Sequence, residues 1–164
     1  MYKHSGSSLV EVMVALFVVA IGLMGILALQ TKSGQFNKSA DTYTRAMTLA
    51  NDIAERIRIN PKNVAAYAST ELPQAAPTNC STNNISTAAC SAADLVSWDL
   101  YQWSEAIKQS LPAGAGSIAE KTLGSADYLQ ITVSFDENPL GSDSANVRKQ
   151  YTLLVEHPTQ LGGA

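Results

Sequence analysis

The longest apolar stretch of the chain runs from Leu9 to Leu29 and contains one charge, Glu11. A helix of about 21 residues spans roughly 30 Å of hydrocarbon. A cleaved secretory signal has a shorter apolar region and a small-residue cleavage pattern, which the residues near Leu29 lack. We therefore expect a retained helical anchor. Because Lys3 precedes the run, the short N-terminus is predicted to stay cytoplasmic and the rest to be exported.

Helical periodicity continues beyond the apolar run, since no proline occurs between Gln30 and Ile59. Asn60-Pro61 ends the pattern, because the residue before a proline is pushed out of the helical region. The prediction is one helix of about fifty residues. Its first half is apolar all round and its second half is amphipathic. A helix of this length cannot be buried in so small a domain, so it is expected to protrude. The predicted buried stripe, with spacings of four and three, comprises Phe36, Ala40, Tyr43, Met47, Ala50, Ala54 and Ile57, widened by Leu49 and Ile53.

A second, shorter helix follows a long break in regular structure. Small polar residues and prolines over residues 62–93 predict an irregular segment. Ser91 followed by Asp94 resembles a helix-capping box. The apolar residues behind it repeat at helical spacing as far as Leu111, and Pro112 stops the pattern.

The period then changes to two, which is typical of half-buried strands. Two strands are predicted at residues 128–135 and 147–155, with a weaker one at 117–122. The fold class is therefore α+β: a small antiparallel sheet on which the amphipathic half of the long helix packs, plus the short second helix. Trp98 and Trp103 on that helix are expected to pack on the sheet rather than to form a binding platform.

The chain has two cysteines, Cys80 and Cys90, both in the irregular segment. In an exported domain, two cysteines ten residues apart favour a disulfide that closes a short loop. Metal ligation and free thiols are the alternatives. A zinc site needs two more ligands, and His4 and His157 are badly placed to supply them.

Composition and motifs argue against several classes of function. The net charge of −3 gives no indication of nucleic-acid binding. Asp136, Glu137 and Asp143 lie in a polar loop without a calcium-loop pattern, which favours a solvated turn. The sequence contains no nucleophile motif, no phosphate loop and no catalytic histidine cluster. The chain is therefore predicted not to be an enzyme and to bind no cofactor or metal.

Glu11 is an ionisable residue inside a membrane-length helix, which by default suggests a function. The simpler alternative is a charge near a helix end that reaches water. If the chain were cut after Gly6, Ser7 would carry the new amino group and Glu11 would be the fifth residue. These opposite charges could pair within one chain or between chains, since an unpaired buried charge is costly. Glu11 is thus predicted to act in assembly.

The stretch Gly6-Ser7-Ser8-Leu9-Val10-Glu11, followed by a long apolar helix, resembles the class III signal of type IV prepilins and pseudopilins. The resemblance implies that a prepilin peptidase cuts between Gly6 and Ser7 and methylates Ser7. The first mature residue is usually phenylalanine in the family, and here it is a serine. The implied organisation is a leader (1–6), a transmembrane and filament-core half-helix (7–29), an amphipathic half-helix (30–60) and a periplasmic globular domain (61–164).

Within this superfamily the chain resembles the PilV-type minor pilins, the pilus modification proteins. The resemblance rests on Leu9 to Leu16 and Ala20 to Leu23, on the helix with Trp98, and on Leu111 to Gly116 and Val133 to Asp136. It implies a minor subunit that works with other minor pilins, the major pilin and the inner-membrane assembly machinery, and that supports adhesion and twitching motility. The implied location is the inner membrane with a periplasmic domain, then the pilus on the cell surface. The alternatives are a type II secretion pseudopilin and a monomeric membrane-anchored periplasmic protein.

Overall fold

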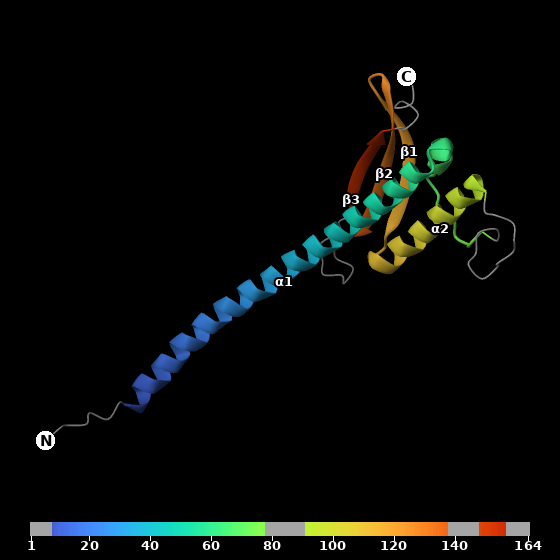
Figure 1. Ribbon diagram of the computed structural model, residues 1–164. Helices are drawn as coiled ribbons and strands as arrows, with labels where there is room; N and C mark the ends of the chain where they lie inside the picture. Colours follow the sequence, from blue (N-terminus) through green and yellow to red (C-terminus); the bar gives the residue numbers. More distant parts are fainter. Residues whose placement is uncertain (1–7, 78–90, 138–147, 157–164) are drawn as a thin grey trace. The chain divides into compact units, whose positions relative to one another are not determined.

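The computed structural model describes residues 8–77, 91–137 and 148–156 (Figure 1). Its contacts divide the chain into two units, residues 1–40 and 41–164, each of which is described by itself. Gly6, Ser7, Cys80 and Cys90 lie outside the described residues, so the cleavage, methylation and disulfide remain predictions. The elements are α1 (Leu9–Ile59), η1 (Pro61–Tyr67), α2 (Ala92–Ser110), β1 (Ala115–Leu123), β2 (Ala126–Asp136) and β3 (Arg148–Glu156).

Helix α1 is continuous over 51 residues, which confirms the predicted length and end. In the first unit its residues Leu9 to Lys38 are all exposed, including every apolar side chain of the predicted anchor. The mean hydropathy of its most apolar window is 2.9, and none of that window is buried. A helix that is apolar on every face belongs in lipid or among other helices. By length and composition, this segment is able to cross a membrane.

In the second unit, β1, β2 and β3 form one antiparallel sheet in that order. β1 pairs with β2 from Ala115↔Ser134 to Leu123↔Ala126, and β2 pairs with β3 from Tyr128↔Glu156 onwards. The central strand β2 buries every second residue, as the period-two pattern predicted. Its four buried apolar side chains form the floor of the core: Leu129, Ile131, Val133 and Phe135.

The C-terminal part of α1 and helix α2 cover the same face of this sheet (Figure 1). The indole N–H of Trp103 in α2 donates to the carbonyl oxygen of Leu49 in α1 at 2.9 Å. The rings of Tyr43 in α1 and Tyr151 in β3 meet edge to face, with centroids 5.6 Å apart. α1 therefore lies beside β3, while α2 packs on β1, where the ring of Trp103 contacts Gly116.

The buried stripe of α1 differs from the predicted one at its N-terminal end. Ala50, Ala54 and Ile57 are buried as predicted, but Tyr43 is 46% exposed and Met47 39% exposed. Phe36 is exposed as well, whereas Ala46, which was not part of the predicted stripe, is buried. Tyr43 still lies on the sheet side of α1, because its ring meets that of Tyr151 in β3. The buried residues of α1 begin at Ala46, so Tyr43 lies before the fully packed part of the helix and stays partly exposed.

Residues 61–67 correct the expectation of an irregular segment, because they form the 3₁₀-helix η1. Pro61 suits the first turn of a helix, where its missing N–H is not needed. Val64 and Tyr67, three residues apart, lie on one face and are buried in the core. A single turn with two apolar residues gives too short a pattern for periodicity to detect.

Helix α2 begins as predicted, with Ser91 as its N-cap and a complete capping box with Asp94. The two tryptophans differ. Trp103 is fully buried and packs on the sheet, as expected. Trp98 is only half-buried, and its ring lies 6.1 Å from that of Tyr101 on the same helix.

Candidate functional site

The start of α1 is fixed by the residue that precedes it. The backbone N–H of Glu11 donates to the side-chain oxygen of Ser8 at 3.3 Å and to the Ser8 carbonyl oxygen at 2.9 Å. Ser8 therefore acts as an N-cap, with Glu11 at the third helical position. The spacing Ser-x-x-Glu is itself a helix-start pattern. Sequence reasoning treated Glu11 only as a charge and missed this second role.

This position gives the carboxylate of Glu11 a favourable local environment. An acidic side chain in the first turn of a helix interacts well with the helix dipole, typically by 0.3–1 kcal/mol. Around it the surface of α1 is apolar, with Val10, Val12 and Val14 all exposed. One anionic group at the start of an otherwise apolar helix can interact with a cation at a similar depth in the membrane.

In the second unit, the principal polar cluster is centred on Asp99 of α2, which is buried. Its carboxylate accepts a hydrogen bond from Arg56 Nη1 at 3.0 Å and one from the hydroxyl of Tyr67 at 2.7 Å. Arg56 is also bonded to Asp52 and to Gln102. The cluster therefore joins α1, η1 and α2.

The charges of this cluster stabilise one another. Partial burial acts to lower the pKa of Arg56, but its hydrogen bond to Asp99 and the charges of Asp52 and Asp99 outweigh burial and raise it. Burial, followed by the hydrogen bond to Asp99, raises the pKa of Tyr67 to about 12. Every group has a partner and the surroundings are packed helices. We read the cluster as a structural clamp rather than a site for chemistry.

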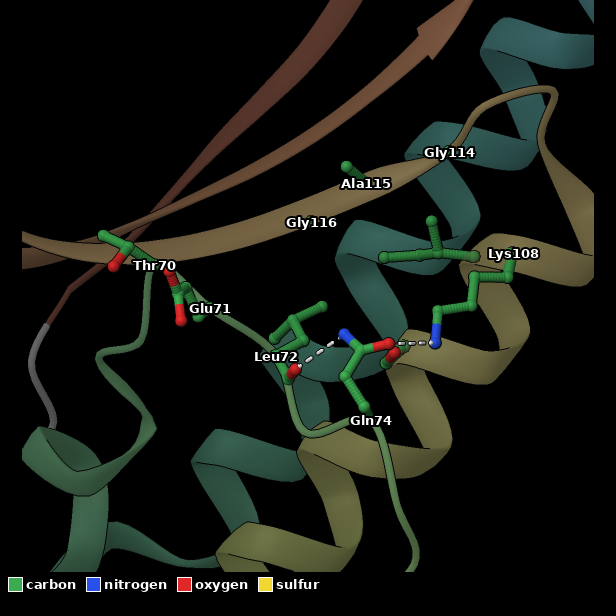
Figure 2. A pocket seen from close by; sticks show the side chains of 10 residues that line it. Thr70, Glu71, Leu72, Gln74, Lys108, Gly114, Ala115 and Gly116 are labelled. Carbon is green, nitrogen blue, oxygen red and sulfur yellow. Dashed lines mark hydrogen bonds between the residues drawn. The ribbon is translucent and has the colours of Figure 1, made fainter.

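A cavity of about 330 Å³ lies between α2, β1 and residues 70–74 (Figure 2). On one side Lys108 Nζ is bonded to the side-chain oxygens of Gln74 and Glu105, each at 3.0 Å. Gly114, just before β1, and Gly116, within it, line another side of the cavity. A side chain at either glycine would collide with Ile107 or Trp103, so the glycines let β1 approach α2.

Two acidic residues at the end of β2 form ion pairs. Asp136 pairs with Arg148 at 3.5 Å, and Glu137 pairs with Lys149 at 2.8 Å. Both pairs tie the end of β2 to the start of β3. Asp143 lies outside the described residues. Over residues 8–77, 91–137 and 148–156, no three His, Cys, Asp or Glu side chains are grouped as metal ligands would be.

Two protein-family models match the chain. The one described as "Prokaryotic N-terminal methylation motif" matches residues 1–27, and the one described as "Type IV pilin Tt1218" matches residues 28–101. Comparisons with curated proteins and with solved structures give no match. The two matched regions meet within α1, so a single helix contributes to both.

Proposed function

The chain belongs to the type IV pilin superfamily, and from this we propose that it is a minor pilin of a type IV pilus. It works with other minor pilins and the major pilin to start assembly at the inner membrane, and so supports adhesion and twitching motility. The N-terminal resemblance to PilV-type proteins supports the minor role. Its location is the inner membrane with a periplasmic domain, then the pilus.

One observation carries this proposal: α1 begins as a bare apolar helix with an acidic residue in its first turn. Cleavage after Gly6 places a new amino group at Ser7, four residues before Glu11. In a bundle of such helices the carboxylate of one chain pairs with the amino group of its neighbour, because neither charge tolerates burial alone. That pairing sets the axial position of each subunit.

A deletion strain tests the function. The account expects loss of surface pili and of twitching, with secretion through the type II pathway unchanged, and restoration by the wild-type chain. Loss of secretion with normal pili would instead assign the chain as a pseudopilin. Normal pili together with normal secretion would contradict both assignments.

A matched pair of variants separates the two roles of Glu11. Glu11→Gln removes the charge but keeps a side chain able to serve at the third position of a capping box, so it should fail to restore piliation. Ser8→Ala removes the N-cap and keeps the charge. Its cost is about 1 kcal/mol of helix stability, so piliation should be restored. Restoration of piliation by both variants would show that the charge is not needed.

A further inference from the structure

Among the described residues, the outer edge of β1 is paired only at Ile118. Ser69 forms an isolated antiparallel bridge to Ile118, with N–H···O distances of 2.8 Å in both directions. Because backbone groups alternate in direction along an antiparallel strand, this bridge identifies which residues of β1 point away from β2. They are Gly116, Ile118, Glu120 and Thr122, the residues in phase with Ile118.

The chain leaves this edge on both sides of Ser69. In an antiparallel register Tyr67 would oppose Glu120, but Tyr67 belongs to η1 and is buried in the core. The outward N–H and C=O groups of Glu120 and Thr122 therefore face away from all described strands. Residues Ala119 to Ser125 are exposed. The last β2–β3 pair is Tyr128↔Glu156, so the tip of the β1–β2 hairpin extends past the described part of β3.

A shallow surface depression of about 530 Å³ adjoins this edge, between residues 68–71 and residues 118–120. Its lining includes two acidic residues, Glu71 and Glu120, and no basic one. Lys121 lies on the opposite face of the strand, where it bonds Gln130. A partner residue opposite Glu120 would place its side chain beside this carboxylate. Two copies paired edge to edge would bring like charges together, which disfavours a second copy of the chain as the occupant.

We propose that the edge of β1 from Glu120 to Thr122 docks an extended segment of a partner protein by strand addition, and that a lysine or arginine of that segment pairs with Glu120 and Glu71. Main-chain hydrogen bonds provide the affinity in this mode of recognition, and alternate side chains provide the selectivity. An exposed edge with unpaired N–H and C=O groups is a template for such an added strand.

Residue-resolved hydrogen exchange on the full chain in non-ionic detergent micelles tests this. The probe is a short capped peptide in which threonine alternates with lysine, and the control peptide has glutamate in place of lysine. Without peptide, the Glu120 and Thr122 amides should exchange fast, while those of Ala119 and Lys121, bonded to β2, should be protected. The lysine peptide should protect Glu120 and Thr122, and the control peptide should not.

Two variants extend the test. Thr122→Pro removes one outward donor without touching the β2 ladder, so it should abolish the protection while Leu129 and Ile131 keep theirs; Thr122→Ala controls for the lost hydroxyl. Glu120→Gln should weaken peptide binding by roughly two- to five-fold. Equal protection by both peptides, protection only elsewhere, or none at the highest soluble peptide concentration would overturn the proposal. So would concentration-dependent protection of these amides without peptide, which would indicate a second copy.

Discussion

The indole nitrogen of Trp103 lies 2.9 Å from the carbonyl oxygen of Leu49 and donates a hydrogen bond to it. This bond crosses from α2 to α1 at a point where Trp103 is fully buried. The same ring packs against Gly116 of β1, so one side chain joins both helices and the sheet. The position of α2 on the sheet therefore depends on this residue.

Trp103→Phe should destabilise the second unit by about 2–3 kcal/mol. It removes the hydrogen bond to the Leu49 carbonyl and opens a void beside the glycine. The measurement is urea denaturation of the full chain in detergent. Trp98→Phe, at a half-buried site on the same helix, is the control and should cost less than about 1 kcal/mol. An equal loss of unfolding free energy in the two variants would show that the contacts of Trp103 are unimportant.

Gly116→Ala should also destabilise the fold, because its methyl group would lie 2.7 Å from the ring of Trp103. Overpacking of this kind typically costs 1–3 kcal/mol. Gly25→Ala is the matched control, since no atom lies within 4 Å of the added carbon. A wild-type midpoint for Gly116→Ala in the same denaturation measurement would contradict the close approach of β1 to α2.

Asp99→Ala should cost about 2–4 kcal/mol, because it leaves Arg56 and the hydroxyl of Tyr67 without their buried acceptor. Asp52→Ala removes the other carboxylate bonded to Arg56, but this pair lies one turn apart on the exposed side of α1. Its loss should cost about 0.5 kcal/mol or less. If the two variants were equally stable, Asp99 would not be the centre of the clamp.

Stability should fall at high pH because of Tyr67. Its pKa is raised to about 12 in the folded chain, against about 10 in an unfolded one. Because the pKa of Tyr67 is higher in the folded chain, its contribution to the free energy of unfolding is complete below about pH 10. That contribution is lost as the pH rises towards about 12. Ultraviolet titration of the phenols should show a late step that is lost in Tyr67→Phe. A late step that persists in Tyr67→Phe would assign the shift to another tyrosine.

The cysteines give a further prediction, at positions outside the described residues. Alkylation of the exported, unreduced chain should leave Cys80 and Cys90 unmodified, because they are joined in a disulfide. In the chain-entropy model a loop of this size contributes roughly 3 kcal/mol. Cys80→Ser and Cys90→Ser should lower the denaturation midpoint equally. Alkylation of both thiols before reduction would contradict the bridge.

Much of the fold followed from the sequence, and the failures have local causes. β2, β3 and α2 had clear periods or end signals, such as the capping box at Ser91, whereas β1 was predicted only as a weaker strand at residues 117–122. Tyr43 was predicted to be buried because periodicity shows which face of a helix is apolar but not where along the helix its burial begins, which is at Ala46. η1 was missed because Val64 and Tyr67 form only one turn. The bridge between Ser69 and Ile118 joins residues far apart in the sequence, and no local pattern predicts it.

The candidate functional features also divide into those that the sequence predicts and those that it does not. Glu11 stood out because a charge inside an apolar run is rare. Its bond to Ser8 was missed, although the spacing of serine and glutamate carries the signal for it. The part of the β1 edge that no described strand pairs with could not be predicted from the sequence, since it depends on where the chain after η1 meets the sheet. Which groups point outward follows only from the observed register.

The mass of the mature chain isolated from its native cells tests the central claim most directly. The account predicts a chain that begins at Ser7 and carries one additional methyl group on its amino nitrogen. It also predicts that Gly6→Ala, Glu11→Gln and wild type differ in piliation while sharing a folded second unit. A mature chain that still begins at Met1, or one cut after Leu29, would contradict the assignment to an assembling pilin.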